Sequence, residues 1–180
     1  MADFHKNDIF MNRIFLIGYM GSGKTTVGKL LSEKLGYGFV DMDAHLEEKH
    51  FKSVSEIFAK LGEDEFRRLE KDCLHEVAEF ENVVISTGGG APCFFDNINF
   101  MNARGLTVYL KLSANELANR LAHSREGKRP LLADKKGEDL IQFISVGLAS
   151  REPFYTQAAL SVSSEDENVI SQICDFAKNI

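Results

Sequence analysis

The sequence predicts an α/β protein: a central parallel sheet of about five strands with helices on both of its faces. Short apolar runs rich in β-branched residues alternate with longer amphipathic stretches along most of the chain. A glycine-rich loop at residues 18–25 stands between the first apolar run and the first helical pattern. Together these observations indicate a three-layer α/β/α architecture with the strand before the loop near the centre of the sheet.

The composition is typical of a globular protein of one domain. The chain has 180 residues, of which 44% are hydrophobic and 27% charged, and a domain of this size buries about 70% of its unfolded surface. We expect a single domain over residues 1–180, with residues 1–11 as an N-terminal appendage that lacks an apolar signal core. No apolar run approaches the ~20 residues of a membrane helix, so we expect no membrane contact.

Charge and cysteine usage narrow the function classes further. The formal net charge of −6 argues against a general nucleic-acid binder. The three cysteines are scattered without a C-x-x-C pair, and the five histidines lack the H-E-x-x-H spacing, so neither a disulfide framework nor a zinc site is indicated. We expect a cytoplasmic monomer.

The first elements along the chain follow from hydrophobic spacing. Residues 13–17 are short, apolar and β-branched, as a buried strand should be. Residues 27–35 carry apolar side chains at helical spacing and are followed by Gly36, a common helix stop. Residues 39–40 form a short second strand that runs into Asp41.

Three helical stretches separate the second strand from the third. Residues 44–50 form the first, and a capping box at Ser53 opens a short helix that ends near Gly62. Residues 63–80 form a long amphipathic helix whose apolar stripe includes Phe80. Residues 83–85 are the third strand.

The second half of the chain repeats the alternation. Residues 92–104 are ambiguous and suggest a turn with a helix around 98–101, whereas residues 107–112 read as a fourth strand. A second capping box, at Ser113, leads a helix to about residue 122. Three further elements follow: a helix at 137–150, a strand at 160–162 and a helix at 169–178.

The polar and basic stretch 123–136 interrupts this pattern. It is interpreted as a lid over a bound nucleotide, with a plain surface loop as the alternative.

The glycine-rich loop carries the most specific chemistry. Its sequence GYMGSGKT fits G-x-x-x-x-G-K-[ST], whose backbone N–H groups cradle phosphates while the lysine reaches the outer phosphates and the hydroxyl serves Mg²⁺. We expect the nucleotide to be held by the loop and the first helical turn: Gly21, Ser22, Gly23, Lys24, Thr25, Thr26, Val27 and Gly28.

Two aspartates follow the second strand, where ligands bind in open α/β sheets. Asp41 and Asp43 could serve Mg²⁺ and the substrate separately, and a carboxylate there could orient an attacking hydroxyl and accept its proton. Alternatively, one or both of these aspartates cap the next helix.

The long helix contributes an arginine candidate. On helical spacing Arg67 shares a face with Glu63, Glu70 and Leu74, so Arg67 could bind a carboxylate while Glu70 holds it in place. The helix pattern alone favours an ordinary surface ion pair.

The glycines Gly88, Gly89 and Gly90 follow the third strand. Three in succession favour close backbone approach by a ligand over a simple turn. The segments around Arg129 and Arg151 are weak signals by themselves.

Taken together, these motifs resemble the shikimate kinase family. The segments that carry the resemblance are GYMGSGKTT, DMD, EIF, GEDEFRRLE, STGGGA, KRPLL and SREPFY. They stand in the family's order and spacing from about residue 13 to the last helix. The resemblance implies a P-loop kinase fold with a substrate-binding segment at about 43–80 and a lid at about 123–136. It also implies transfer of the γ-phosphoryl group of MgATP to the 3-hydroxyl of shikimate, in aromatic amino-acid biosynthesis.

The resemblance also implies individual roles on the nucleotide side. Lys24 would hold the phosphates, and Thr25, Asp41 and Ser86 would lie at the Mg²⁺. Arg120 would lie beside the adenine, and Arg129 would reach the transferring phosphoryl group from the lid.

On the acceptor side, the resemblance makes Asp43 the residue that binds substrate hydroxyls and acts as base or orienter. Arg67 and Arg151 would clamp the substrate carboxylate, with Glu70 orienting Arg67. Gly89 and its neighbours Gly88 and Gly90 would contact a ring hydroxyl. Phe58 and Phe66 would form the pocket wall.

The sequence departs from the family pattern in two places. Thr25 and Thr26 replace the usual Ser-Thr pair, which preserves the hydroxyls. Residues 163–167 are polar and acidic where the family often has a basic residue near the adenine.

Two alternatives to the shikimate kinase reading stay open. One is another small-metabolite kinase acting on gluconate or a nucleotide. The other is a P-loop module that binds nucleotide without turnover.

Overall fold

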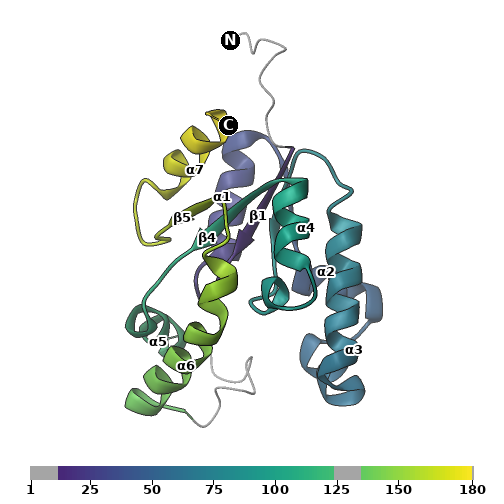
Figure 1. Ribbon diagram of the computed structural model, residues 1–180, viewed down its shortest axis with the longest axis vertical. Coiled ribbons are helices and arrows are strands. Elements are labelled where there is room, and N and C mark those ends of the chain that lie inside the picture. The colour runs from purple at the N-terminus through teal and green to yellow at the C-terminus, as the bar shows by residue number, and fades with distance from the viewer. Residues whose placement is uncertain (1–11, 124–134, 180) are drawn as a thin grey trace.

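The computed structural model describes residues 12–123 and 135–179. Within them, a parallel five-stranded sheet has the order β2-β3-β1-β4-β5 (Figure 1). β1, the strand before the glycine-rich loop, lies at the centre, as the sequence predicts. The strands are β1 (Arg13–Ile17), β2 (Gly38–Asp41), β3 (Val83–Ser86), β4 (Leu106–Leu110) and β5 (Leu160–Val162).

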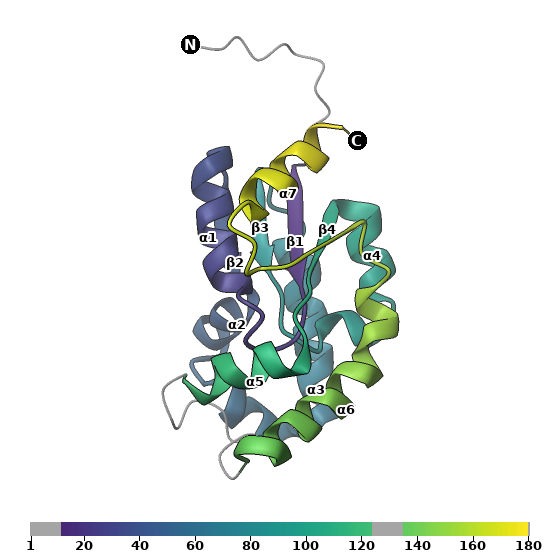
Figure 2. The same cartoon turned by 90° about the vertical axis from the view of Figure 1, so that its left-hand side faces the viewer.

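Helices connect the strands and cover both faces of the sheet (Figures 1 and 2). They are α1 (Lys24–Leu35), α2 (Met42–His50), α3 (Val54–Val77), α4 (Asn97–Arg104), α5 (Ala114–Ala122), α6 (Gly137–Tyr155) and α7 (Val169–Lys178), with a short 3₁₀ turn, η1, at Ala91–Cys93. None of these helices has the length and apolar character that a membrane crossing requires.

Side chains of the central strand alternate between two cores. In β1, Phe15 and Ile17 face the core formed with α3, α4 and α6. Ile14 and Leu16 face the core formed with α1 and α7. This period of two, with both faces buried, is what a parallel sheet covered by helices requires. The expected three-layer architecture is confirmed.

α3 is two helical segments joined at a kink. Gly62 has φ 79° and ψ 173°, a backbone conformation that is essentially restricted to glycine. The capping box at Ser53 opens the first segment, and the second begins after Gly62, as the glycine and the capping signal predict. The first segment buries only Ile57, whereas the second buries Phe66, Glu70, Cys73, Leu74 and Val77.

Several boundaries differ from the sequence prediction. α3 ends at Val77, so the predicted apolar stripe is wrong at Phe80, which is 42% exposed. β4 ends at Leu110 rather than at 112. α6 runs through Pro153 to Tyr155 instead of ending near 150, because Tyr155 is fully buried and its packing outweighs the proline signal.

Candidate active site

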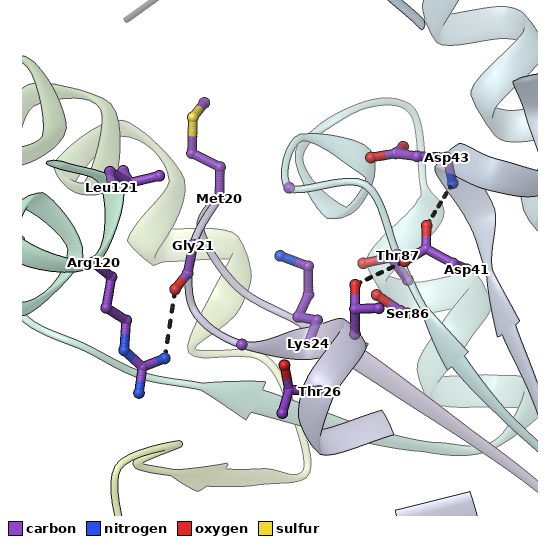
Figure 3. Close-up of a pocket in the computed structure, with 13 residues that line it drawn as sticks. Met20, Gly21, Lys24, Thr26, Asp41, Asp43, Ser86, Thr87, Arg120 and Leu121 are labelled. Atoms are coloured by element: carbon purple, nitrogen blue, oxygen red, sulfur yellow. Dashed lines mark hydrogen bonds between the residues drawn. The ribbon is translucent and has the colours of Figure 1, made fainter. Parts of the chain in front are cut away.

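A cavity of about 460 Å³ opens at the carboxyl ends of β1, β2 and β3 (Figure 3). The glycine-rich loop forms its floor, the ends of β2 and β3 form one side, and α5 forms the other. Its walls are Met20, Gly21, Gly23, Lys24, Thr25, Thr26, Asp41, Asp43, Ser86, Thr87, Gly89, Arg120 and Leu121. The cavity therefore unites the loop and the two aspartates that the sequence singled out.

Lys24 stands at the start of α1 and points into this cavity (Figure 3). Its Nζ donates hydrogen bonds to the carbonyl oxygens of Gly18 at 2.9 Å and Tyr19 at 3.0 Å. The ammonium group is thereby held at the N-terminus of a helix, where the helix dipole favours anions. This arrangement suits a phosphate group.

Asp41 divides its two carboxylate oxygens between two tasks. Oδ1 accepts from the backbone N–H groups of Asp43 at 3.2 Å and Ala44 at 3.4 Å, which caps α2. Oδ2 accepts from the Thr25 hydroxyl at 2.8 Å. The capping alternative considered from the sequence is therefore correct for Asp41, and it leaves a carboxylate oxygen beside the hydroxyl of the loop.

The oxygen atoms at this end of the cavity fit a magnesium ion. Ser86 ends β3, is paired in register with Asp41 and lines the cavity with Thr25. Hydroxyl and carboxylate oxygens are the donors that Mg²⁺ accepts, together with water and substrate phosphates. Residues 12–123 and 135–179 contain no group of three or more His, Cys, Asp or Glu side chains that could hold a metal by itself.

Asp43 lies in the first turn of α2 and is open to the cavity. Surrounding protein atoms withdraw bulk solvent from its carboxyl group, which raises its pKa; the charge of Asp41 adds to this rise and the ammonium of Lys24 opposes it. Asp43 therefore holds a proton more tightly than an ordinary aspartate does. That property suits a group that accepts a proton from an alcohol.

Arg67 and Glu70 form a buried ion pair on α3. Arg67 Nη1 lies 2.7 Å from Glu70 Oε2, and the two side chains are 12% and 4% exposed. Arg67 Nη2 also contacts Glu63 at 3.2 Å. Burial raises the pKa of Glu70, while the adjacent guanidinium opposes that rise. The surface ion pair favoured by the helix pattern alone is wrong, because the glycine turn after β3 covers this face.

Aromatic rings enclose the Arg67 guanidinium. Its central carbon lies 5.1 Å from the ring centroid of Phe66 and 4.1 Å from that of Phe94. Phe58 packs against Phe66 at 5.4 Å between ring centroids. Phe94 was not among the predicted site residues, because it falls in the stretch whose pattern is ambiguous and nothing in its spacing links it to Arg67.

Two of the three glycines, Gly88 and Gly90, make room for protein side chains. A Cβ at Gly88 would lie 2.3 Å from Glu70 Oε1 and 3.1 Å from Asp43 Oδ1, and a Cβ at Gly90 would lie 2.6 Å from Arg67 Nη1. Gly89 alone of the three lines the cavity. Gly88 and Gly90 thus let Glu70, Asp43 and Arg67 approach, and their direct contact with a ligand stays a prediction.

Arg151 reaches the same neighbourhood from α6. Its guanidinium lies 4.9 Å from the ring centroid of Tyr19 and acts electrostatically on Glu70 and Tyr155. The Tyr155 hydroxyl donates to the Gly89 carbonyl at 2.5 Å. Two arginines from distant parts of the sequence thus approach Glu70 beside the cavity.

Arg120 lies across the loop from the aspartates (Figure 3). It contacts Glu165 at 3.1 Å, the Ser164 hydroxyl at 3.0 Å and the Gly21 carbonyl at 3.5 Å. The acidic stretch that departs from the family pattern therefore gives Arg120 a partner.

Other predicted residues lie outside the cavity wall. The Val27 side chain is buried, and Gly28 packs against Phe39, so both face the core. Ser22 is also buried within the loop. Arg129, together with residues 124–134 of the predicted lid, lies outside the described residues.

Three wall residues were not predicted. Met20 and Leu121 carry no polar signal, and Thr87 stands inside the STGGGA segment, where its hydroxyl donates to the Leu16 carbonyl at 3.1 Å. Only their position in the fold places them at the site.

Comparison with known proteins agrees with this geometry. The model of the shikimate kinase family matches residues 20–178. A shikimate kinase of Parabacteroides distasonis is 53% identical over 167 residues, which cover 93% of this chain and 96% of that protein.

Solved structures give the same result. The crystal structure of shikimate kinase from Bacteroides thetaiotaomicron has a TM-score of 0.85 and 48% identity, covering 94% of this chain and 97% of that one. The shikimate kinase of Acinetobacter baumannii, solved in complex with shikimate, has a TM-score of 0.82 and 33% identity, covering 92% of both chains. The chain belongs to the shikimate kinase family.

Proposed function

We propose that this protein transfers the γ-phosphoryl group of ATP to the 3-hydroxyl of shikimate, giving shikimate 3-phosphate and ADP. The observation that carries the proposal is the position of Asp43. It lines one cavity with Lys24 and lies within electrostatic reach of Arg67. This position supports a role for Asp43 as proton acceptor between the loop that would bind phosphate and the arginine that would bind the carboxylate.

The nucleotide would occupy the loop side of the cavity. Lys24 and the amides of residues 21–26 would hold its phosphates, as the loop pattern requires. Arg120 and Leu121 line the same wall, which puts a cation and an apolar surface where the base would lie. Arg129 is proposed, from the sequence alone, to contact the transferring phosphoryl group from a lid.

The acceptor would lie beside α3 and α6, within the proposed substrate-binding segment 43–80 and its surroundings. A planar guanidinium binds a carboxylate through two hydrogen bonds, and Arg67 and Arg151 both approach this place. Phe58 and Phe66 would pack against the ring face. The remaining hydroxyls would meet Asp43 and the backbone of Gly89.

In the transfer step, the 3-hydroxyl oxygen forms a bond to the γ-phosphorus while the bond from that phosphorus to the β-γ bridging oxygen breaks. Asp43 orients the hydroxyl and receives its proton, and the electron pair of the broken bond leaves on ADP. Lys24 offsets negative charge on the phosphate oxygens, which is the main protein contribution in phosphoryl transfer.

Thr25, Asp41 and Ser86 would hold Mg²⁺, through water where a side chain does not reach it. The ion would supply charge neutralisation of the phosphate oxygens.

The three cysteines are free in the structure, which supports a reducing compartment such as the cytoplasm.

A coupled assay of ADP release tests the proposal directly. ATP and Mg²⁺ are supplied with shikimate, gluconate, a nucleoside monophosphate or no acceptor. The proposal expects release only with shikimate, and product analysis should find phosphate on the 3-hydroxyl. Release with gluconate or the nucleotide alone would favour another small-metabolite kinase, and binding of ATP without release would favour a non-catalytic module.

A further inference from the structure

Tyr19, the second residue of the glycine-rich loop, is placed beneath the substrate-binding arginine of α6. Its side chain is 2% exposed, and the Arg151 guanidinium lies 4.9 Å from its ring centroid. The loop pattern leaves this position unspecified, so phosphate binding alone does not explain a large buried ring here.

α6 is shaped to accept that ring. A Cβ at Gly147 would lie 2.5 Å from the Tyr19 hydroxyl oxygen and 3.2 Å from two ring carbons. Glycine within a helix is unfavourable relative to alanine, so Gly147 has a packing reason. Gly147 and Arg151 are four residues apart and therefore share one face of α6.

Two tyrosines thus flank the Arg151 guanidinium. Tyr19 presents its ring face, and Tyr155 lies close enough to interact electrostatically with the guanidinium. The neighbouring Glu152 is engaged elsewhere, with the Tyr109 hydroxyl at 2.7 Å and Lys111 at 3.0 Å. A long, flexible arginine side chain contacted on two sides loses less freedom when it binds an anion.

We propose that Tyr19 is a positioning residue, which holds Arg151 in the orientation that receives the carboxylate of the acceptor. The inference rests on the proposed function, because it assigns Arg151 to that carboxylate. It follows that one loop residue touches both halves of the site: the Tyr19 carbonyl accepts from Lys24 Nζ at 3.0 Å while its ring supports Arg151.

Tyr19→Leu tests the role of the ring, and Tyr19→Phe is the matched variant that keeps the ring. Loss of the stacking contact should raise the KM for shikimate by about 3- to 10-fold, in line with the strength of cation–π contacts. The KM for ATP should change by less than about 2-fold. Tyr19→Phe should stay near wild type, as should Tyr37→Leu, which removes a half-buried tyrosine that packs in the other core.

A double-mutant cycle separates positioning from general destabilisation. If Tyr19 acts through Arg151, Tyr19→Leu should add almost nothing to the KM defect of Arg151→Ala. Independent, multiplying effects would overturn the proposal, and so would an unchanged KM in Tyr19→Leu.

Gly147→Ala provides a second route that keeps Tyr19 itself. Alanine suits the helix better but pushes the ring away, so the shikimate KM should rise while the melting temperature is retained. Adding Tyr19→Phe, which removes the closest oxygen, should recover part of the loss in shikimate affinity. Wild-type kinetics in Gly147→Ala would contradict the assignment.

A wild-type protein without shikimate-dependent ADP release would overturn the proposed function as well. Normal turnover of the wild type, with an unchanged KM for shikimate in the variants, would overturn only the role of Tyr19.

Discussion

In the proposed mechanism, Asp43 is the residue that links the nucleotide to the acceptor hydroxyl. Replacing it with asparagine keeps the size and removes the proton acceptor. Asp43→Asn should lower kcat by about 10²- to 10⁴-fold, the usual contribution of general base catalysis, while ADP binding measured by calorimetry stays nearly unchanged. Turnover close to wild type would remove Asp43 from the proton transfer.

The ionised Asp43 carboxyl group should favour catalysis but lower the stability of the folded protein. Its pKa is raised in the folded protein, first by loss of solvent and then by Asp41, so the folded state binds this proton more tightly than the unfolded chain does. Ionisation therefore costs stability as pH rises from the ordinary pKa through the raised one.

Without ligands, Asp43→Asn should consequently melt at a higher temperature than wild type at neutral pH. The difference should shrink as the pH falls towards the ordinary aspartate value, where both side chains are neutral. Thermal unfolding followed by circular dichroism across that range measures it. A difference that grows on acidification would show that the sign is wrong.

Arg67 and Arg68 are adjacent on α3 and form a natural pair of variant and control. Arg67 is buried against Glu70 and two aromatic rings, whereas Arg68 is 69% exposed and contacts only Glu65 in the described part of the chain. Arg67→Ala should raise the KM for shikimate by about 10- to 100-fold, because a charge-assisted contact is worth ~1.5–3 kcal/mol. Arg68→Ala should leave steady-state kinetics unchanged; equal effects would reject the carboxylate role.

At the scale of elements, the side chains that pack against the turn after β3 determine which substitutions the turn accepts. Gly90 has an ordinary backbone conformation, with φ −91° and ψ −18°, so alanine there meets no backbone strain. The obstacle is the Arg67 guanidinium, 2.6 Å from the new Cβ. Gly90→Ala should therefore displace Arg67 and raise the KM for shikimate several-fold.

Gly38 in β2 serves as the control for this substitution. A Cβ there would meet its nearest neighbour at 3.8 Å, an ordinary contact. Gly38→Ala should keep both kinetics and melting temperature. A Gly90→Ala variant with normal shikimate kinetics would mean that the turn yields, and that the close packing is not needed for acceptor binding.

For the whole molecule, ligand binding should appear as added stability. A ligand at 100 times its Kd adds about 2.7 kcal/mol, which in a domain of this size raises the melting temperature by roughly 5–10 °C. Shikimate should produce such a shift in wild type but not in Arg67→Ala at the same concentration. A shift with gluconate and none with shikimate would assign the acceptor site to a different metabolite.

The architecture was predictable from the sequence to a large extent. Apolar runs such as residues 13–17 and the capping boxes at Ser53 and Ser113 are local signals, and the structure confirms them. The end of α6 was not predictable, because the packing of Tyr155 against β4 and the glycine turn outweighs the local effect of Pro153. The prediction for Phe80 was wrong for the converse reason. Phe80 continues the apolar spacing of the helix, but the helix itself ends at Val77.

The site was predictable where a residue type has a chemical signature. Lys24, Asp41 and Asp43 carry such signatures and line one cavity. Tyr19 and Phe94 do not, since an aromatic ring beside an arginine is visible only once the chain is folded. The burial of Arg67 likewise depends on which face of α3 packs against the turn after β3, and helix spacing does not contain that information.

The kink at Gly62 divides α3 into a part anchored in the core and a part that is almost free of it. The stretch between Asp43 and Gly62 contributes few buried side chains, so its length and composition can change while the sheet, the phosphate loop and Asp43 stay intact. Engineered exchange of that stretch is therefore a route to new acceptor alcohols on an unaltered phosphoryl-transfer framework, with Gly62 as the natural splice point.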